Sequence, residues 1–226
     1  MADVKQFGGV CGAVQGGSSA GLLLSFVPRD YLQGLMLEAS VTEADRHDIR
    51  ASIAGDERAF GRLLERYEAQ VFAQMWRFTR DQRVLDELVQ DVFVEVFLSL
   101  PKFRGDAPFL HWLRRIATRV GYRHWRQEHR ERRRAQLLEQ RPWTPPAGIR
   151  QLSATEAAEQ LFGLLAGLAP KDRLVLTLHY LEECSAKEIS ERTGWTPTLV
   201  RVRLHRAGKR LRRLVTTAGH GRTPHD

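Results

Sequence analysis

Apolar residues recur at helical spacing through most of the chain beyond residue 42, and no segment shows the alternation of a strand. The strongest pattern predicts a helix over residues 85–100, which Pro101 ends. Its apolar stripe consists of Leu85, Leu88, Val89, Val92, Phe93, Val96, Phe97 and Leu100. Upstream, Thr42 opens a capping-box pattern before a short helix, and a longer amphipathic helix follows Gly55.

A further helix begins at Phe109, after the loop 102–108. Its buried stripe is predicted to hold Trp112, Leu113, Ile116, Ala117 and Val120. Since it belongs to this stripe, Trp112 is expected in the core rather than on the surface. The opposite side of the helix carries a row of cations, namely Arg115, Arg119, Arg123 and Arg126.

The last third of the chain predicts four short helices. Pro170 separates the first two, and the third opens with a capping box, Ser185-Ala186-Lys187-Glu188. Gly194 suits the end of that helix, and Thr196 caps a fourth helix that has Pro197 at its first position. Together, residues 185–213 have the pattern of a helix-turn-helix. A plain helical hairpin with a basic outer face is the alternative.

These elements predict an all-α protein of two small helical domains joined by a flexible linker, the C-terminal domain being a helix-turn-helix. The expected boundaries are 42–127 and 155–215, with a proline-containing linker at 128–154 that starts as a helical extension. The glycine-rich residues 1–41 and the tail 216–226 are expected to be disordered, and Met36 is a possible translation start.

The formal net charge of +8 and the pI of about 10.1 suggest a polyanionic partner. Acidic residues prevail over residues 43–100, whereas residues 101–141 and 192–213 are strongly basic. This distribution favours two nucleic-acid contacts and a separate protein partner, although charged helix faces can also be merely solvated. In the helix-turn-helix, Arg201, Val202, His205 and Arg206 are predicted to face the major groove, and Lys209 and Arg210 to hold phosphates.

No motif of an enzyme or a metal site is found in the sequence. The histidines are scattered, and His179 with Cys184 lacks further nearby ligands. Cys11 and Cys184 are expected to be unpaired thiols. With no cofactor motif, no signal peptide and no membrane-spanning run, we expect a soluble, cytoplasmic protein that is not an enzyme and does not insert into a membrane.

Two blocks give a specific resemblance. SAKEISERTGWTPTLVRVRLHRAGKRL (185–211) resembles the promoter-reading C-terminal domain of extracytoplasmic-function (ECF) sigma factors of bacterial RNA polymerase. DELVQDVFVEVFLSLPKFRGDAPFLHWLRRIATRV (86–120) looks like their N-terminal domain, which binds core polymerase and melts the promoter. The resemblance covers residues 43–215 and implies a non-catalytic initiation subunit. A helix-turn-helix regulator that acts without polymerase is the alternative.

The resemblance also implies roles for residues. Gln90, Asp91 and Glu95 would contact core polymerase. Phe103, Arg104 and Asp106 would shape the loop that holds an unstacked minus-ten base, and the four arginines Arg115, Arg119, Arg123 and Arg126 would follow the strand. Many relatives have asparagine at the position of Arg119, and small polar residues at those of Leu199 and Val202, so promoter preference does not transfer. The implied partners are core RNA polymerase, promoter DNA and an anti-sigma factor.

Overall fold

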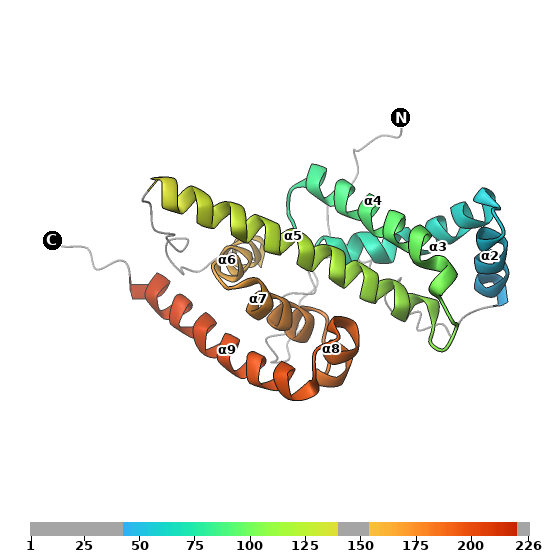
Figure 1. Cartoon of the computed structure of the whole chain (residues 1–226). Helices are drawn as coiled ribbons and strands as arrows, with labels where there is room; N and C mark the ends of the chain where they lie inside the picture. The colour runs from blue at the N-terminus through green and yellow to red at the C-terminus, as the bar shows by residue number, and fades with distance from the viewer. Residues whose placement is uncertain (1–42, 140–153, 221–226) are drawn as a thin grey trace.

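A computed structural model describes residues 43–139 and 154–220, and within these ranges the chain is entirely helical (Figure 1). The N-terminal unit comprises α2 (Glu43–Ile53), α3 (Glu57–Met75), α4 (Gln82–Ser99), a 3-10 turn η2 (Leu100–Lys102) and α5 (Phe109–Glu139). The C-terminal unit comprises α6 (Ala154–Ala166), α7 (Pro170–Leu176), a π-helical segment η3 (Thr177–Leu181), α8 (Ala186–Thr193) and α9 (Pro197–His220). The all-α prediction is therefore confirmed.

A buried polar network joins α2 to α3. Asp48 accepts hydrogen bonds from Arg62 and Arg66, and the Tyr67 hydroxyl donates to Asp45 over 2.8 Å. Burial raises the pKa of Asp48, but the two arginines outweigh it and hold this pKa below its usual value. Asp45 and Asp48 belong to the acidic stretch 43–100, yet both are buried. Each carboxylate is matched with donors, as a buried charge requires.

The centre of the N-terminal unit lies where α5 passes the turn between α3 and α4. The Trp125 indole donates to the Phe78 carbonyl over 2.7 Å, and the two rings are 4.4 Å apart. A Cβ atom on Gly121 would lie 2.4 Å from the Phe78 ring, so glycine permits the close approach of α5 at this point. Trp125 and Phe78 are both buried.

The C-terminal unit has the predicted helix-turn-helix. Ser185 and Glu188 form the capping box of α8, and Gly194 ends the helix with φ +75°, a conformation that favours glycine. Val200 and Ala207 bury one side of α9. α5 continues to Glu139, so the segment predicted as a linker at 128–154 starts as a helix, as expected, whereas α9 runs further than expected, to His220, past residue 215. The segments 1–42 and 140–153, with most of the predicted extension and linker, lie outside the described residues.

The two units touch along α5. This helix contacts both α7 and α8, and α6, α7 and α8 lie between α5 and α9 (Figure 1). Separate domains joined only by a flexible linker were expected, and their mutual packing was not anticipated.

Candidate nucleic-acid and partner interfaces

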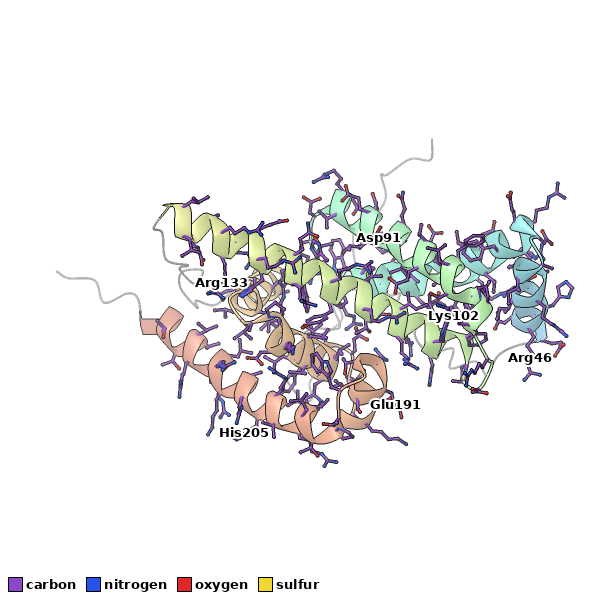
Figure 2. All side chains as sticks on the ribbon, viewed as in Figure 1. Arg46, Asp91, Lys102, Arg133, Glu191 and His205 are labelled. Carbon is purple, nitrogen blue, oxygen red and sulfur yellow. The ribbon has the colours of Figure 1, made fainter. Side chains whose placement is uncertain are left out.

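The outer side of α9 is a row of exposed side chains. Its N-terminal turn is capped by the Thr196 hydroxyl, which accepts from the Leu199 amide over 3.3 Å. All six residues predicted to face DNA are exposed: Arg201, Val202, His205, Arg206, Lys209 and Arg210. His205 lies on the side of α9 that points away from α5 (Figure 2). Exposed arginines near the start of a helix can reach base edges in a major groove.

A buried carboxylate of α7 forms ion pairs with two arginines of α9. Asp172, in the first turn of α7, accepts from Arg203 over 3.1 Å and from Arg210. Arg210, which was predicted to hold a phosphate, therefore has an internal partner, although its side chain is still more than half exposed. Arg203 was not singled out in the sequence. Its seven-residue spacing from Arg210 places both on one side of a helix, and that was the available signal.

The predicted arginine row of α5 is also exposed. Arg115, Arg119, Arg123 and Arg126 all reach solvent. Glu95 of α4 bridges two of them, its two carboxylate oxygens lying 3.1 Å from Arg119 and 3.1 Å from Arg123. Glu95, which the sequence suggested as a polymerase contact, thus faces the arginine row across the α4–α5 interface. This carboxylate partly offsets the repulsion between two arginines one turn apart.

The loop before α5 is built on an aromatic cluster. The Phe103 ring lies 5.4 Å from that of Phe109 and 5.2 Å from that of Trp112. Phe103 is only partly buried, and Arg104 and Asp106 are exposed beside it. Gly105 has φ +76°, which turns the backbone sharply between them. Phe109 is buried, whereas Trp112 is only partly buried and lies at the edge of the core rather than within it as predicted.

The outer face of α4 combines polar and apolar side chains. Gln90 and Asp91 are exposed as predicted, and Asp91 lies on this helix in Figure 2. The same face shows Val94, Phe97 and Leu98 at 58%, 51% and 70% exposure. Phe97 was expected in the core, but it contacts Phe60 only edge-on, with ring centroids 5.0 Å apart. The signal was an excess of apolar residues over what one buried stripe of a helix can hold.

Nothing in the described residues suggests chemistry beyond binding. No group of three His, Cys, Asp or Glu side chains that could hold a metal occurs in residues 43–139 and 154–220. His179 Nδ1 lies 2.9 Å from the Cys184 backbone carbonyl, not from its thiol. Burial raises the pKa of the Cys184 thiol to about 11. In the same part of the chain, no helix has the length and apolarity to cross a bilayer.

Comparison with known proteins identifies the family of this chain. Residues 63–131 match sigma-70 region 2, and residues 152–211 match sigma-70 region 4. The ECF RNA polymerase sigma factor SigD of Mycobacterium tuberculosis is 30% identical over 203 residues, covering 87% of this chain and 92% of SigD. The chain belongs to the ECF sigma factors. The resemblance seen in the sequence is confirmed, and this sigma factor directs transcription initiation without catalysis of its own.

Other relatives agree. The ECF sigma-E factor of Escherichia coli is 26% identical over 162 residues, which cover 68% of this chain and 84% of that factor. A probable sigma factor of Xanthomonas campestris, RfaY, is 28% identical over 166 residues. This match covers 71% of this chain but only 41% of RfaY. The solved structure of CnrH in complex with the cytosolic domain of CnrY superposes with a TM-score of 0.52 at 27% identity, covering 77% of this sigma factor and 99% of CnrH.

Proposed function

We propose that this sigma factor divides its work among three separate surfaces: the outer face of α4 for core RNA polymerase, the arginine row of α5 for the minus-ten region, and the outer side of α9 for the minus-thirty-five element. One observation supports this most. The three surfaces lie on different helices, and most of the predicted side chains on each are exposed while both units are folded.

The polymerase contact is centred on apolar side chains. Val94, Phe97 and Leu98 form an exposed apolar stripe, flanked by Gln90 and Asp91. Protein interfaces combine such an apolar centre with a polar rim. Glu95 is not part of this rim, because its two carboxylate oxygens already pair with Arg119 and Arg123. We therefore assign the contact to Gln90, Asp91 and the apolar stripe.

The minus-ten contact uses the loop and the row that follows it. Phe103, together with Trp112, provides an aromatic wall against which an unstacked base can lie, with Arg104 and Asp106 exposed at its edge. Arg115, Arg119, Arg123 and Arg126 provide cations along the path of the strand. On α9, Arg201 and Arg206 suit guanine edges, and Val202 and Leu199 offer apolar contact to thymine methyl groups.

A test of the α4 assignment uses purified core polymerase and a start-site assay on genomic fragments. We expect the substitutions Leu98→Ala and Asp91→Ala to weaken core binding and specific initiation, with Glu68→Ala, an exposed acidic residue of α3, as the control. Core binding that is unchanged in both α4 variants would contradict the assigned surface. A helix-turn-helix regulator independent of polymerase would bind its promoters equally well without core.

We further propose a cytoplasmic location and control by a protein inhibitor. CnrH is known in complex with the cytosolic domain of CnrY. The exposed apolar stripe of α4 would suit such a partner here, since it would otherwise remain in contact with water. Co-purification from cells should recover a second protein that competes with core polymerase. Recovery of polymerase alone under every growth condition would count against an inhibitor.

A further inference from the structure

Glu95 lies between the helix that is proposed to bind polymerase and the arginine row of α5. Its neighbours Val92 and Val96 are buried, which fixes this part of α4 against the core. One carboxylate oxygen of Glu95 accepts a hydrogen bond from Arg123 over 3.1 Å, and the other lies 3.1 Å from Arg119. The packing of α4 against α5 therefore holds a carboxylate beside the two central cations of the row.

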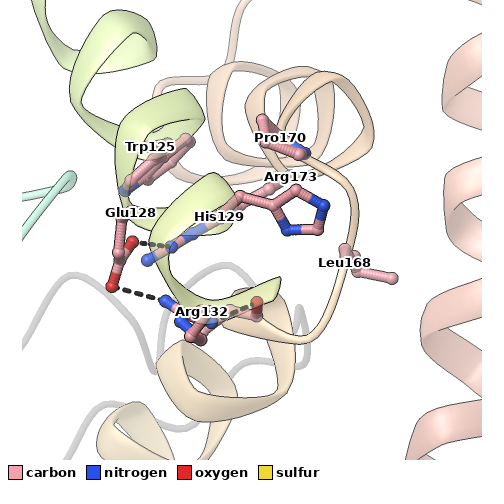
Figure 3. A pocket seen from close by; sticks show the side chains of 8 residues that line it. Trp125, Glu128, His129, Arg132, Leu168, Pro170 and Arg173 are labelled. Atoms are coloured by element: carbon pink, nitrogen blue, oxygen red, sulfur yellow. Dashed lines mark hydrogen bonds and ion pairs between the residues drawn. The ribbon is translucent and has the colours of Figure 1, made fainter. Parts of the chain in front are cut away.

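The bridge formed by Glu95 differs from other such bridges in its access to solvent. Glu128, for example, pairs with Arg132 and Arg173 (Figure 3). The Arg173 side chain is only 4% exposed, so that a larger anion cannot reach it. Among the carboxylates of residues 43–139 and 154–220 that bridge two arginines, only Glu95 holds a pair whose members are both more than half exposed. These two arginines can therefore exchange their carboxylate for another anion.

A phosphate of the minus-ten strand would compete with Glu95 for the same donors. Carboxylate and phosphate oxygens accept hydrogen bonds from a guanidinium in the same geometry. Each arginine contacts Glu95 through a single terminal nitrogen, so that further N–H donors remain for an incoming anion. Within the part of the chain that the structure describes, the outer members of the row, Arg115 and Arg126, form no ion pair with a carboxylate. A strand along the row thus meets two cations without a carboxylate and two that must first leave Glu95.

We propose that Glu95 is a built-in competitor of the minus-ten strand. It positions Arg119 and Arg123 on the path of the strand, and it lowers the affinity of the row for any strand that is held through its phosphates alone. Tight binding then requires a further contact, such as a base seated against Phe103, which a non-specific strand lacks. This inference rests on the proposed function of the arginine row. It gives Glu95 a role at the DNA in place of the polymerase contact that the sequence suggested.

The test measures the affinity of the holoenzyme for a fluorescent single-stranded minus-ten fragment. Glu95→Gln removes the charge and keeps the shape of the side chain. Because an exposed ion pair typically changes an equilibrium constant by a factor of about two, the loss of two pairs should raise the affinity about fourfold. A fragment of scrambled sequence should gain equally, since the competition concerns phosphates. Glu68→Gln, which removes the same charge from an exposed position of α3, should leave both affinities unchanged.

A second set of variants separates competition at the arginines from a general change of charge. In a background of Arg119→Ala and Arg123→Ala, Glu95→Gln should no longer raise the affinity, because both partners of the carboxylate are gone. The matched background of Arg115→Ala and Arg126→Ala loses the same charge from the same row, and there the gain should persist. An equal gain in both backgrounds, or no gain with the row intact, would overturn the proposal. Weaker core binding by Glu95→Gln would also overturn it, in favour of a polymerase contact.

Failure of the proposed function gives a different result. If the variant with Arg119→Ala and Arg123→Ala binds the minus-ten fragment as tightly as the wild type, the row does not hold the strand. If this variant binds weakly and Glu95→Gln still brings no gain with the row intact, the row is correctly assigned and only the competing role of Glu95 is wrong.

Discussion

Helices α5 and α9 each carry two arginines bridged by one carboxylate, but the two bridges differ in burial. Asp172 bridges Arg203 and Arg210 of α9 with its side chain only 1% exposed. Glu95 bridges Arg119 and Arg123 of α5 with a side chain that is 25% exposed, and both arginines are 59% exposed. Both bridges are ion pairs between one carboxylate and two guanidinium groups. The contribution of each bridge to the free energy of unfolding depends on how much water surrounds its carboxylate.

The buried bridge should produce the largest effect when it is broken. Asp172→Ala leaves two arginines of α9 without their internal carboxylate, and we expect the free energy of unfolding of the C-terminal unit to fall by about 3 kcal/mol. Amide exchange within α7 and α9, followed in denaturant, measures this. Asp106→Ala, an exposed acidic residue, is the control. A loss below about 1 kcal/mol would show that Asp172 behaves like a surface pair.

The arginines of α9 should carry sequence preference. Arg201→Ala or Arg206→Ala is expected to cost about 1–3 kcal/mol of discrimination for the upstream element if either side chain pairs with a base. Initiation by the holoenzyme on templates with and without this element is the measurement. Lys209→Ala serves as the comparison, since a phosphate contact weakens binding equally on all sequences. An unchanged upstream preference in both arginine variants would contradict the assigned side of α9.

The arginines of α5 should behave differently. Arg123→Ala is expected to lower the affinity for a single-stranded minus-ten fragment on every sequence, and to reduce the dependence of log affinity on log salt by about 0.7, since it removes one phosphate contact. Titrations at several salt concentrations test this with the holoenzyme. A selective loss on one sequence would mean that Arg123 reads a base.

The exposed bridge should give the smallest effect. Glu95→Gln is expected to change the free energy of unfolding of the N-terminal unit by less than about 1 kcal/mol, because Arg119 and Arg123 remain solvated. Denaturation of the variant and the wild type gives this value. A loss as large as that for Asp172→Ala would abolish the contrast between the two bridges.

The sequence was a good guide wherever the signal was local. Helical spacing predicted the helix that ends at Pro101, and the Ser185 capping box with Gly194 predicted the turn of the helix-turn-helix. The exposed positions on α5 and α9 followed from the same periodicity. The ion pairs of Glu95 were not predicted, because its partners are 24 and 28 positions further along the chain and helical spacing says nothing about such distances.

The exposed apolar side chains of α4 show the same limit of prediction from helical spacing. Phe97 keeps the spacing of the buried stripe, yet it is half exposed, since α3 covers only part of that side. Arg173 is the opposite case: it is a charged residue, yet it is buried against Trp125 of the other unit. Neither outcome can be read from the residues nearby in the sequence.

By itself, the sequence determined the helices, their caps, the helix-turn-helix and the two family blocks, because each depends on residues within a few turns of one another. Only the tertiary structure decided which charges are used internally, as with Asp172 and Glu95, and which apolar residues of α4 stay in water. It also decided that the two units pack against each other along α5. These features depend on which helix faces are brought together, and the free energy of a charge depends on its surroundings after packing.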